Sequence, residues 1–264
     1  MKNTPKQVDM MHVLTPLPVP FPHPRTKTAV SHSRVSPWLS RLAYTLGQSL
    51  VLPAHFDQIH ITGQENLPRT GPVLLAPTHR SRWDAIMVAY ATGRPVTGRN
   101  MRFMVSINEM KGLQGWLISR LGGFPVNPLQ LRLETIQHSV ELLCEQEMLV
   151  IFPEGNIFRQ RHVEPLKRGV ATIALQAQSK LTAQAPEVQV IPIDISYSDL
   201  SAPRGCQVKI AIGQPLNTLD YQKYSPKQAS RQLTADLQQA LEELATPKTL
   251  KGDRLSEPEP ILVA

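Results

Sequence analysis

Short apolar segments alternate with longer segments of helical periodicity along most of this chain of 264 residues. The apolar segments have the length of strands, which we expect at residues 58–62, 72–76, 101–105, 148–152, 188–195 and 207–212. Helical spacing of apolar residues predicts helices at 82–90, 112–119, 131–144, 169–180 and 226–245. This alternation predicts an α/β fold in which helices cover a mixed, mostly parallel sheet, because parallel strands need long crossover connections.

Both ends of the chain differ in composition from its middle. Residues 1–36 contain the proline-rich run TPLPVPFPHP and lack hydrophobic periodicity, and residues 246–264 are rich in proline and charge. We expect a flexible arm at 1–36 and a flexible tail at 246–264. The length fits one large domain or two small ones, and the continuous pattern favours a single domain over 37–245.

Residues 37–54 have apolar side chains at helical spacing. The set is Trp38, Leu39, Leu42, Leu46, Leu50 and Val51. Such an amphipathic helix can lie in a membrane interface, or its apolar face can pack on the protein's own core, and the pattern leaves both open. Since the chain has no run of roughly 18–20 apolar residues, no transmembrane helix is predicted. We expect a protein of the cytoplasm that meets a membrane only peripherally.

The formal net charge of +7 suits nucleic acid, an anionic membrane surface or an anionic substrate as a partner. Binding of nucleic acid is not expected, because the sequence has no zinc spacing, helix-turn-helix pattern or RNA-recognition aromatic residues. The two cysteines, Cys144 and Cys206, cannot form a disulfide framework and lie outside metal-ligand spacings.

The segment H-R-S-R-W-D, residues 79–84, follows an apolar strand and precedes a helix. Across such a turn the side chains of His79 and Asp84 can meet. The imidazole would then act as a general base, while the carboxylate fixes its tautomer and stabilises the imidazolium. The alternative is structural: Ser81 at the N-cap and Asp84 three residues later would form a capping box.

The segment F-P-E-G, residues 152–155, ends another apolar strand. Ligands of open α/β sheets bind at the carboxyl ends of the strands. Gly155 would let a ligand approach the backbone closely, and Glu154 could accept hydrogen bonds from substrate hydroxyls. An ordinary surface turn is the alternative interpretation.

Two further segments carry weaker signals. A helix predicted up to Ser119 is followed by G-G-F-P-V-N, residues 122–127, which by itself indicates only a helix stop. The apolar segment V-I-P-I, residues 190–193, contains Pro192, and a proline inside a strand predicts a bulge or a sheet edge.

Taken together, these four segments resemble the conserved blocks of the glycerolipid acyltransferases related to bacterial 1-acylglycerol-3-phosphate acyltransferase. H-R-S-R-W-D matches the H-x-x-x-x-D block of that family, and G-G-F-P-V-N, F-P-E-G and V-I-P-I match its other three blocks in the same order. L-K-R-G at 166–169 matches a segment that usually follows the third block. The resemblance covers roughly residues 58–215, and it is carried by the order of four blocks of which none is specific alone.

The resemblance implies a reaction and a set of site residues. His79 would be the base that activates an acceptor hydroxyl, with Asp84 as its partner, and the hydroxyl would attack an acyl thioester directly. The donor would be acyl-CoA or acyl carrier protein, and the acceptor a lysoglycerolipid, expected to be 1-acylglycerol-3-phosphate reacting at its sn-2 hydroxyl. The strand around Pro192 would border the donor side, and neither a metal nor a cofactor is expected. The substrate-binding residues would be Ser81, Phe124, Val126, Asn127, Glu154, Gly155 and Arg159.

The chain departs from the family where basic residues are common. The second block commonly ends in Arg but is followed here by Pro128, and the third commonly continues with Thr-Arg but here continues with Asn156 and Ile157. The acceptor could therefore be another lysolipid or an alcohol, or the chain could be a lipid-binding relative without activity. If the acceptor carries a phosphate, the cations that could bind it from shifted positions are Arg159, Arg161, Lys167, Arg168 and Arg132.

Overall fold

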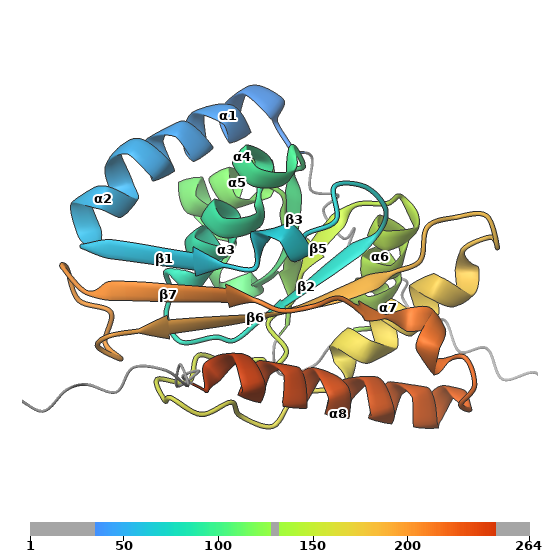
Figure 1. Cartoon of the computed structure of the whole chain (residues 1–264). Coiled ribbons are helices and arrows are strands. Elements are labelled where there is room, and N and C mark those ends of the chain that lie inside the picture. The colour runs from blue at the N-terminus through green and yellow to red at the C-terminus, as the bar shows by residue number, and fades with distance from the viewer. Residues whose placement is uncertain (1–34, 128–131, 247–264) are drawn as a thin grey trace, which may run out of the picture.

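The computed structural model describes residues 35–127 and 132–246, and their centre is an eight-stranded sheet (Figure 1). Seven strands follow the spatial order β1-β7-β6-β2-β5-β3-β4, and β8 pairs with β6. The strands are β1 Gln58–Thr62, β2 Val73–Pro77, β3 Met101–Ser106, β4 Gly123–Val126, β5 Met148–Val150, β6 Gln189–Tyr197, β7 Gln207–Ile212 and β8 Leu216–Asn217.

The sheet is mixed and mostly parallel, as the sequence predicts. The neighbours β6, β2, β5, β3 and β4 run parallel to one another, and so do β1 and β7. Only β7 and β8 run antiparallel to β6. The short connection between β6 and β7 explains their antiparallel pairing, because a parallel pair would need a crossover of a dozen residues or more.

Helices cover both faces of the sheet (Figure 1). They are α1 Pro37–Leu46, α2 Leu52–His55, α3 Asp84–Thr92, α4 Arg94–Thr97, α5 Gly112–Arg120, α6 Leu133–Cys144, α7 Gly169–Lys180 and α8 Pro226–Ala245. Alternate strand residues point to opposite faces. Leu74 and Leu149 pack in one apolar cluster with residues of α6, α7 and α8, whereas Val73 and Val150 pack in another with residues of α2 and α3.

Most predicted elements are confirmed to within a few residues, and β1, β7, α7 and α8 have the predicted bounds. The prediction missed β4, β8 and the short α4. The segment of β4 contains Gly123 and Pro125, which read as a helix stop. The strand predicted at 148–152 ends at Val150, because the chain turns there into the candidate site. The first predicted residue of the helix at 131–144 lies outside the described residues.

Pro192 lies in an interior strand, so the predicted sheet edge is wrong, but the pairing beside it is irregular, as the predicted bulge requires. On one side of β6, Gln189 and Val190 pair with β8, and pairing with β7 starts only at Ile193. Pro192 stands between the two partners, and its carbonyl accepts a hydrogen bond of 2.9 Å from the N–H of Gly213. Proline is tolerated there because no ladder donor is required at the change of partner.

The amphipathic segment predicted at 37–54 is α1, a π-helical turn at Gly47–Val51, and α2. Leu39 and Leu52 are buried, so one side packs on the protein, whereas Trp38 and Leu50 are 66% and 62% exposed. One side of the segment therefore packs on the protein's own core, while membrane binding by its exposed side stays a prediction. Within the described ranges, no helix has the length and apolarity needed to cross a membrane. The predicted arm and tail fall almost wholly outside these ranges.

Candidate active site

His79 lies in the connection from β2 to α3, at the carboxyl end of a central strand. Its Nδ1 atom lies 2.9 Å from Oδ2 of Asp84, the first residue of α3. The imidazole stacks on the ring of Phe152, with 4.0 Å between ring centroids. A carboxylate only accepts hydrogen bonds, so Nδ1 carries a proton, and in the neutral imidazole Nε2 then has a free lone pair. The pair therefore has the arrangement of a general base with its orienting carboxylate.

Four hydrogen bonds hold the buried carboxylate of Asp84. Oδ2 accepts from His79, from the backbone N–H of Arg80 at 2.5 Å and from that of Ser81 at 2.8 Å, and Oδ1 accepts from the hydroxyl of Tyr197 at 2.7 Å. Burial raises the pKa of Tyr197, and the neighbouring Asp84 raises it further, so the hydroxyl remains a donor. Because α3 and β6 both fix Asp84, the orientation of the imidazole is fixed as well.

One of the two hydrogen bonds of the predicted capping box is present. The carboxylate of Asp84 accepts from the N–H of Ser81, as a capping box would require. However, the hydroxyl of Ser81 accepts a bond of 3.3 Å from Trp83, and α3 begins only at Asp84. Capping and the contact with His79 are therefore compatible roles of one carboxylate.

A second buried carboxylate, that of Glu154, joins the loop of His79 to the F-P-E-G turn. Nη1 of Arg80 donates to both of its oxygens at 2.9 and 2.8 Å. The carboxylate also accepts from the backbone N–H of His79 at 2.7 Å and of Glu164 at 2.9 Å. The side chains of Arg80 and Glu154 are 3% and 0% exposed. This pair therefore sets the position of the His79 backbone relative to the turn.

Asp194 of β6 is the third buried carboxyl group of this region. Its Oδ1 accepts a hydrogen bond of 3.2 Å from the hydroxyl of Thr78, the residue before His79. Burial raises the pKa of Asp194 to about 6, although the nearby Arg80 and the bond from Thr78 act in the opposite direction. Asp194 thus titrates between acidic and neutral pH.

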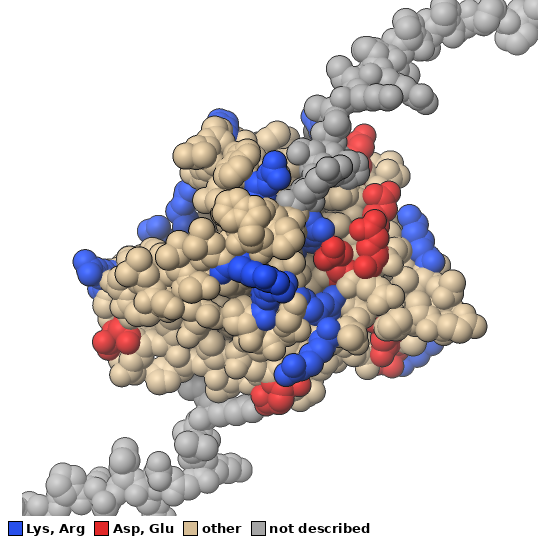
Figure 2. All heavy atoms as spheres, turned by 90° about the horizontal axis from the view of Figure 1, so that it is seen from above, with Lys and Arg blue, Asp and Glu red and all other residues tan. Residues whose placement is uncertain are grey.

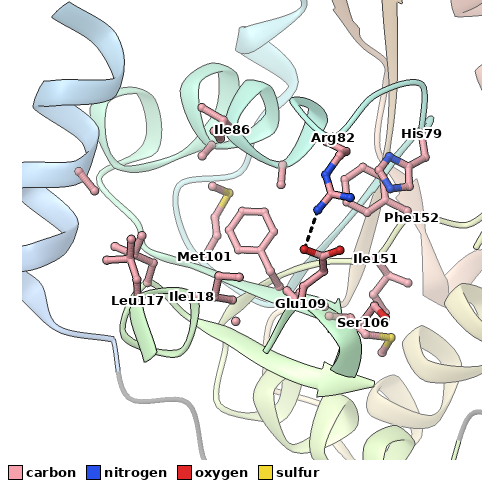
Figure 3. Close-up of a pocket in the computed structure, with 18 of the residues that line it drawn as sticks. His79, Arg82, Ile86, Met101, Ser106, Glu109, Leu117, Ile118, Ile151 and Phe152 are labelled. Carbon is pink, nitrogen blue, oxygen red and sulfur yellow. Dashed lines mark hydrogen bonds and ion pairs between the residues drawn. The ribbon is translucent and has the colours of Figure 1, made fainter. Parts of the chain in front are cut away.

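A cavity of about 1070 Å³ extends from His79 between the N-terminal helices and the edge of the sheet. Figure 3 shows Ile86 of α3, Met101 of β3 and Leu117 and Ile118 of α5 around it, with His79 and Phe152 at the other end. From α1, Leu39, Leu42 and Leu46 complete the wall. Arg82 also borders the cavity and pairs with Glu109 at 2.7 Å. The arrangement places a base at one end of a large, mostly apolar space.

Comparison with known proteins identifies the family. The model of the family described as Acyltransferase matches residues 58–196, more than half of the chain. The chain belongs to this acyltransferase family. A relative from Bacillus subtilis, 1-acyl-sn-glycerol-3-phosphate acyltransferase, is 26% identical over 70% of this chain and 87% of its own length. The protein of the same name from Streptococcus pneumoniae is 25% identical over 69% of this chain and 66% of its own length.

A solved structure shares the fold of this acyltransferase. The crystal structure of the 1-acyl-sn-glycerophosphate acyltransferase PlsC from Thermotoga maritima is 19% identical in sequence, with a TM-score of 0.54. The likeness covers 78% of this chain and 77% of that one. It supports the mixed α/β architecture predicted from the sequence.

The structure brings together only part of the substrate-binding set predicted for this acyltransferase. Val126, Asn127 and Gly155 line the cavity that contains His79. The others do not line it: Ser81, Phe124, Glu154 and Arg159. Phe124 is fully buried, with its ring edge against His138, and the oxygens of Glu154 accept bonds from Arg80 and two backbone N–H groups. Sequence reasoning missed Arg80, which lies inside the first block, and Tyr197, for which no local signal exists.

Proposed function

We propose that this acyltransferase transfers a fatty acyl group from the thioester of acyl-CoA or acyl carrier protein to a lysoglycerolipid. The proposed acceptor group is the sn-2 hydroxyl of 1-acylglycerol-3-phosphate. The observation that carries the proposal is the His79–Asp84 pair at the end of a mostly apolar cavity. The printed activity of the relatives from Bacillus subtilis and Streptococcus pneumoniae supports this acceptor.

In the proposed reaction, Nε2 of His79 takes the proton of the acceptor hydroxyl as its oxygen attacks the thioester carbonyl. Asp84 holds the proton on Nδ1 and stabilises the imidazolium that forms. When the tetrahedral intermediate collapses, the new ester bond remains, the carbon–sulfur bond breaks and the imidazolium returns its proton to the leaving thiolate. No acyl-enzyme is required, because the acceptor hydroxyl itself attacks the thioester carbonyl.

The cavity supplies binding energy for the fatty chain in this proposal. Transferring a methylene group from water to an apolar site contributes about 0.8 kcal/mol. Ile86, Met101 and Leu117 offer such surface on three separate elements. A donor or acceptor without a long chain should therefore react with a much higher KM.

The test is thiol release from acyl-CoA and acyl carrier protein with a panel of lysolipids. His79→Ala should lower turnover by about 10²–10⁴-fold, the usual contribution of a general base. His60→Ala is a matched control, because His60 is exposed on β1 and contacts Gln58. Folding is checked by circular dichroism. A folded His79→Ala variant with undiminished turnover would refute the proposal.

We also propose that the enzyme binds an anionic membrane surface through the segment 37–55 together with α5. Trp38 and Leu42 of α1 and Leu113 and Trp116 of α5 are exposed apolar side chains. The ranges 35–56 and 110–127 contain no Asp or Glu, and their cations are Arg41, Lys111 and Arg120. In Figure 2, which looks onto the α1 side, uncharged residues cover most of the surface. Aromatic, apolar and basic side chains together suit a membrane interface.

Sedimentation with vesicles of mixed neutral and anionic lipids tests this surface. The double substitution Trp38→Ala and Trp116→Ala should weaken binding, since both aromatic anchors are lost. Leu133→Ser is the control, because Leu133 is 66% exposed but lies on α6. Equal binding of the wild type and the double variant would refute the proposed surface while leaving the acyl transfer untouched.

A further inference from the structure

The missing basic residues of the family blocks raise the question of what holds an anionic acceptor in this chain. Two lysine or arginine side chains line the cavity within the described ranges, Arg82 and Lys167. Arg82 pairs with Glu109 at 2.7 Å and its side chain is 72% exposed. The side chain of Lys167 forms no hydrogen bond or ion pair with any residue of the described ranges. Lys167 is therefore the cation whose charge is available to a ligand.

A backbone hydrogen bond ties Lys167 to the F-P-E-G turn, residues 152–155, which also contacts His79. Its N–H donates to the carbonyl of Pro153 at 2.9 Å. Its side chain crosses Gly155 so closely that a Cβ atom there would lie 2.5 Å from Nζ. On the same turn, Phe152 stacks on the imidazole of His79. The ammonium group therefore lies beside the turn that contacts the base.

The other candidate cations do not have this position. Arg159, Arg161, Arg168 and Arg132 are exposed, as Lys167 is, but unlike Lys167 none of them lines the cavity. The position at which the family commonly has an arginine is Ile157, which lines the cavity with an apolar side chain. The positive charge at this end of the cavity thus comes from a residue later in the chain.

We propose that Lys167 binds the phosphate of the acceptor and makes this acyltransferase selective for acceptors that carry a phosphate monoester. The inference rests on the proposed function and assigns one contact within it. An ammonium group is a compact point charge with three donors, which suits a phosphate without demanding one orientation. Gly155 permits the approach, because a side chain there would displace the ammonium group.

The experiment compares two acceptors that differ only in the phosphate, 1-acylglycerol-3-phosphate and 1-acylglycerol, both in neutral mixed micelles. Lys167→Gln should raise KM for the phosphate-bearing acceptor by about 10- to 100-fold, the usual effect of losing a hydrogen bond between charged groups. Its kcat and its kinetics with 1-acylglycerol should change little. Lys167→Arg should restore most of the affinity. Lys180→Gln, at the other end of α7, is the matched control.

Three outcomes would overturn the assignment. An unchanged KM for the phosphate-bearing acceptor in Lys167→Gln removes the contact, and an equal loss with both acceptors makes Lys167 a structural residue. A selective loss in Arg159→Gln, with Lys167→Gln unaffected, moves the contact to Arg159. Failure of the proposed function looks different: the wild type would then release no thiol with either acceptor, whatever stands at position 167.

Discussion

Replacement of Arg80 by methionine tests how strongly the buried ion pair holds the candidate active site. Arg80 is 3% exposed in its side chain, and Nη1 donates to both oxygens of Glu154. Nη2 donates to the carbonyl of His162 at 3.1 Å. Methionine has a similar length and no charge, so Arg80→Met removes these bonds with little change in packing volume.

The expected cost follows from what remains around Glu154. Without Arg80 the carboxylate keeps only the N–H groups of His79 and Glu164, in a position from which water is excluded. Removing one partner of a buried ion pair costs about 3–5 kcal/mol, mostly because the other charge stays buried without a counter-charge. For a domain of this size the melting temperature should fall by roughly 6–20 °C. Glu154→Gln in the same chain should recover much of this loss, because the uncompensated charge disappears.

The assay is urea denaturation followed by circular dichroism, for Arg80→Met, Glu154→Gln and the double variant. Arg82→Met is the control, since the exposed pair of Arg82 with Glu109 should contribute no more than about 1 kcal/mol. Single-variant costs that simply add in the double variant would refute the coupling. So would a cost of Arg80→Met no larger than that of Arg82→Met.

Three further changes test the surrounding contacts. Folding raises the pKa of Asp194 from 3.8 to about 6, so the folded state binds this proton more tightly than the unfolded state does. The free energy of unfolding should therefore fall as pH rises through this window. In denaturation curves at several pH values, Asp194→Asn should remove up to about 3 kcal/mol of this pH dependence. Tyr197→Phe should cost about 1–3 kcal/mol and lower turnover, since Oδ1 of Asp84 loses its donor; unchanged stability and rate would contradict this. Gly155→Ala should lower the free energy of unfolding by about 1–2 kcal/mol, because Gly155 has a φ of +76°. It should also raise KM for the phosphate-bearing acceptor by displacing Lys167, and an unaltered KM would count against that displacement.

The sequence predicts the elements of this fold better than their arrangement. The start of α8 follows from local signals, because Ser225 is its N-cap and Pro226 its first residue. The segment of β4 has no such signal: its glycine and proline are unfavourable in strands, and only pairing with β3 makes it one. The same holds for β6, where the change of partner at Pro192 depends on strands that lie later in the chain.

The contacts of the candidate site also divide into those that a local sequence pattern predicts and those that depend on the fold. His79 and Asp84 are five residues apart and could be found as a local pattern. Tyr197 reaches Asp84 from 113 residues away, and Arg80 meets Glu154 from 74 residues away. Such contacts depend on which loops meet at the carboxyl edge of the sheet, which no short pattern encodes. For that reason the sequence could name Glu154 but could not show that its carboxylate faces inward.

The inward orientation of Glu154 changes how the third block is understood in this chain. An acceptor hydroxyl could reach its oxygens only by displacing Arg80 or a backbone N–H, and a buried group that loses such a bond costs about 1–3 kcal/mol. Glu154 therefore contributes more by fixing the backbone of His79 than it could by binding substrate. In the proposed function, recognition is then left to groups that face the cavity, Gly155 of the turn and the ammonium of Lys167 that crosses it. The two functions of the turn are separated by the direction in which neighbouring residues point.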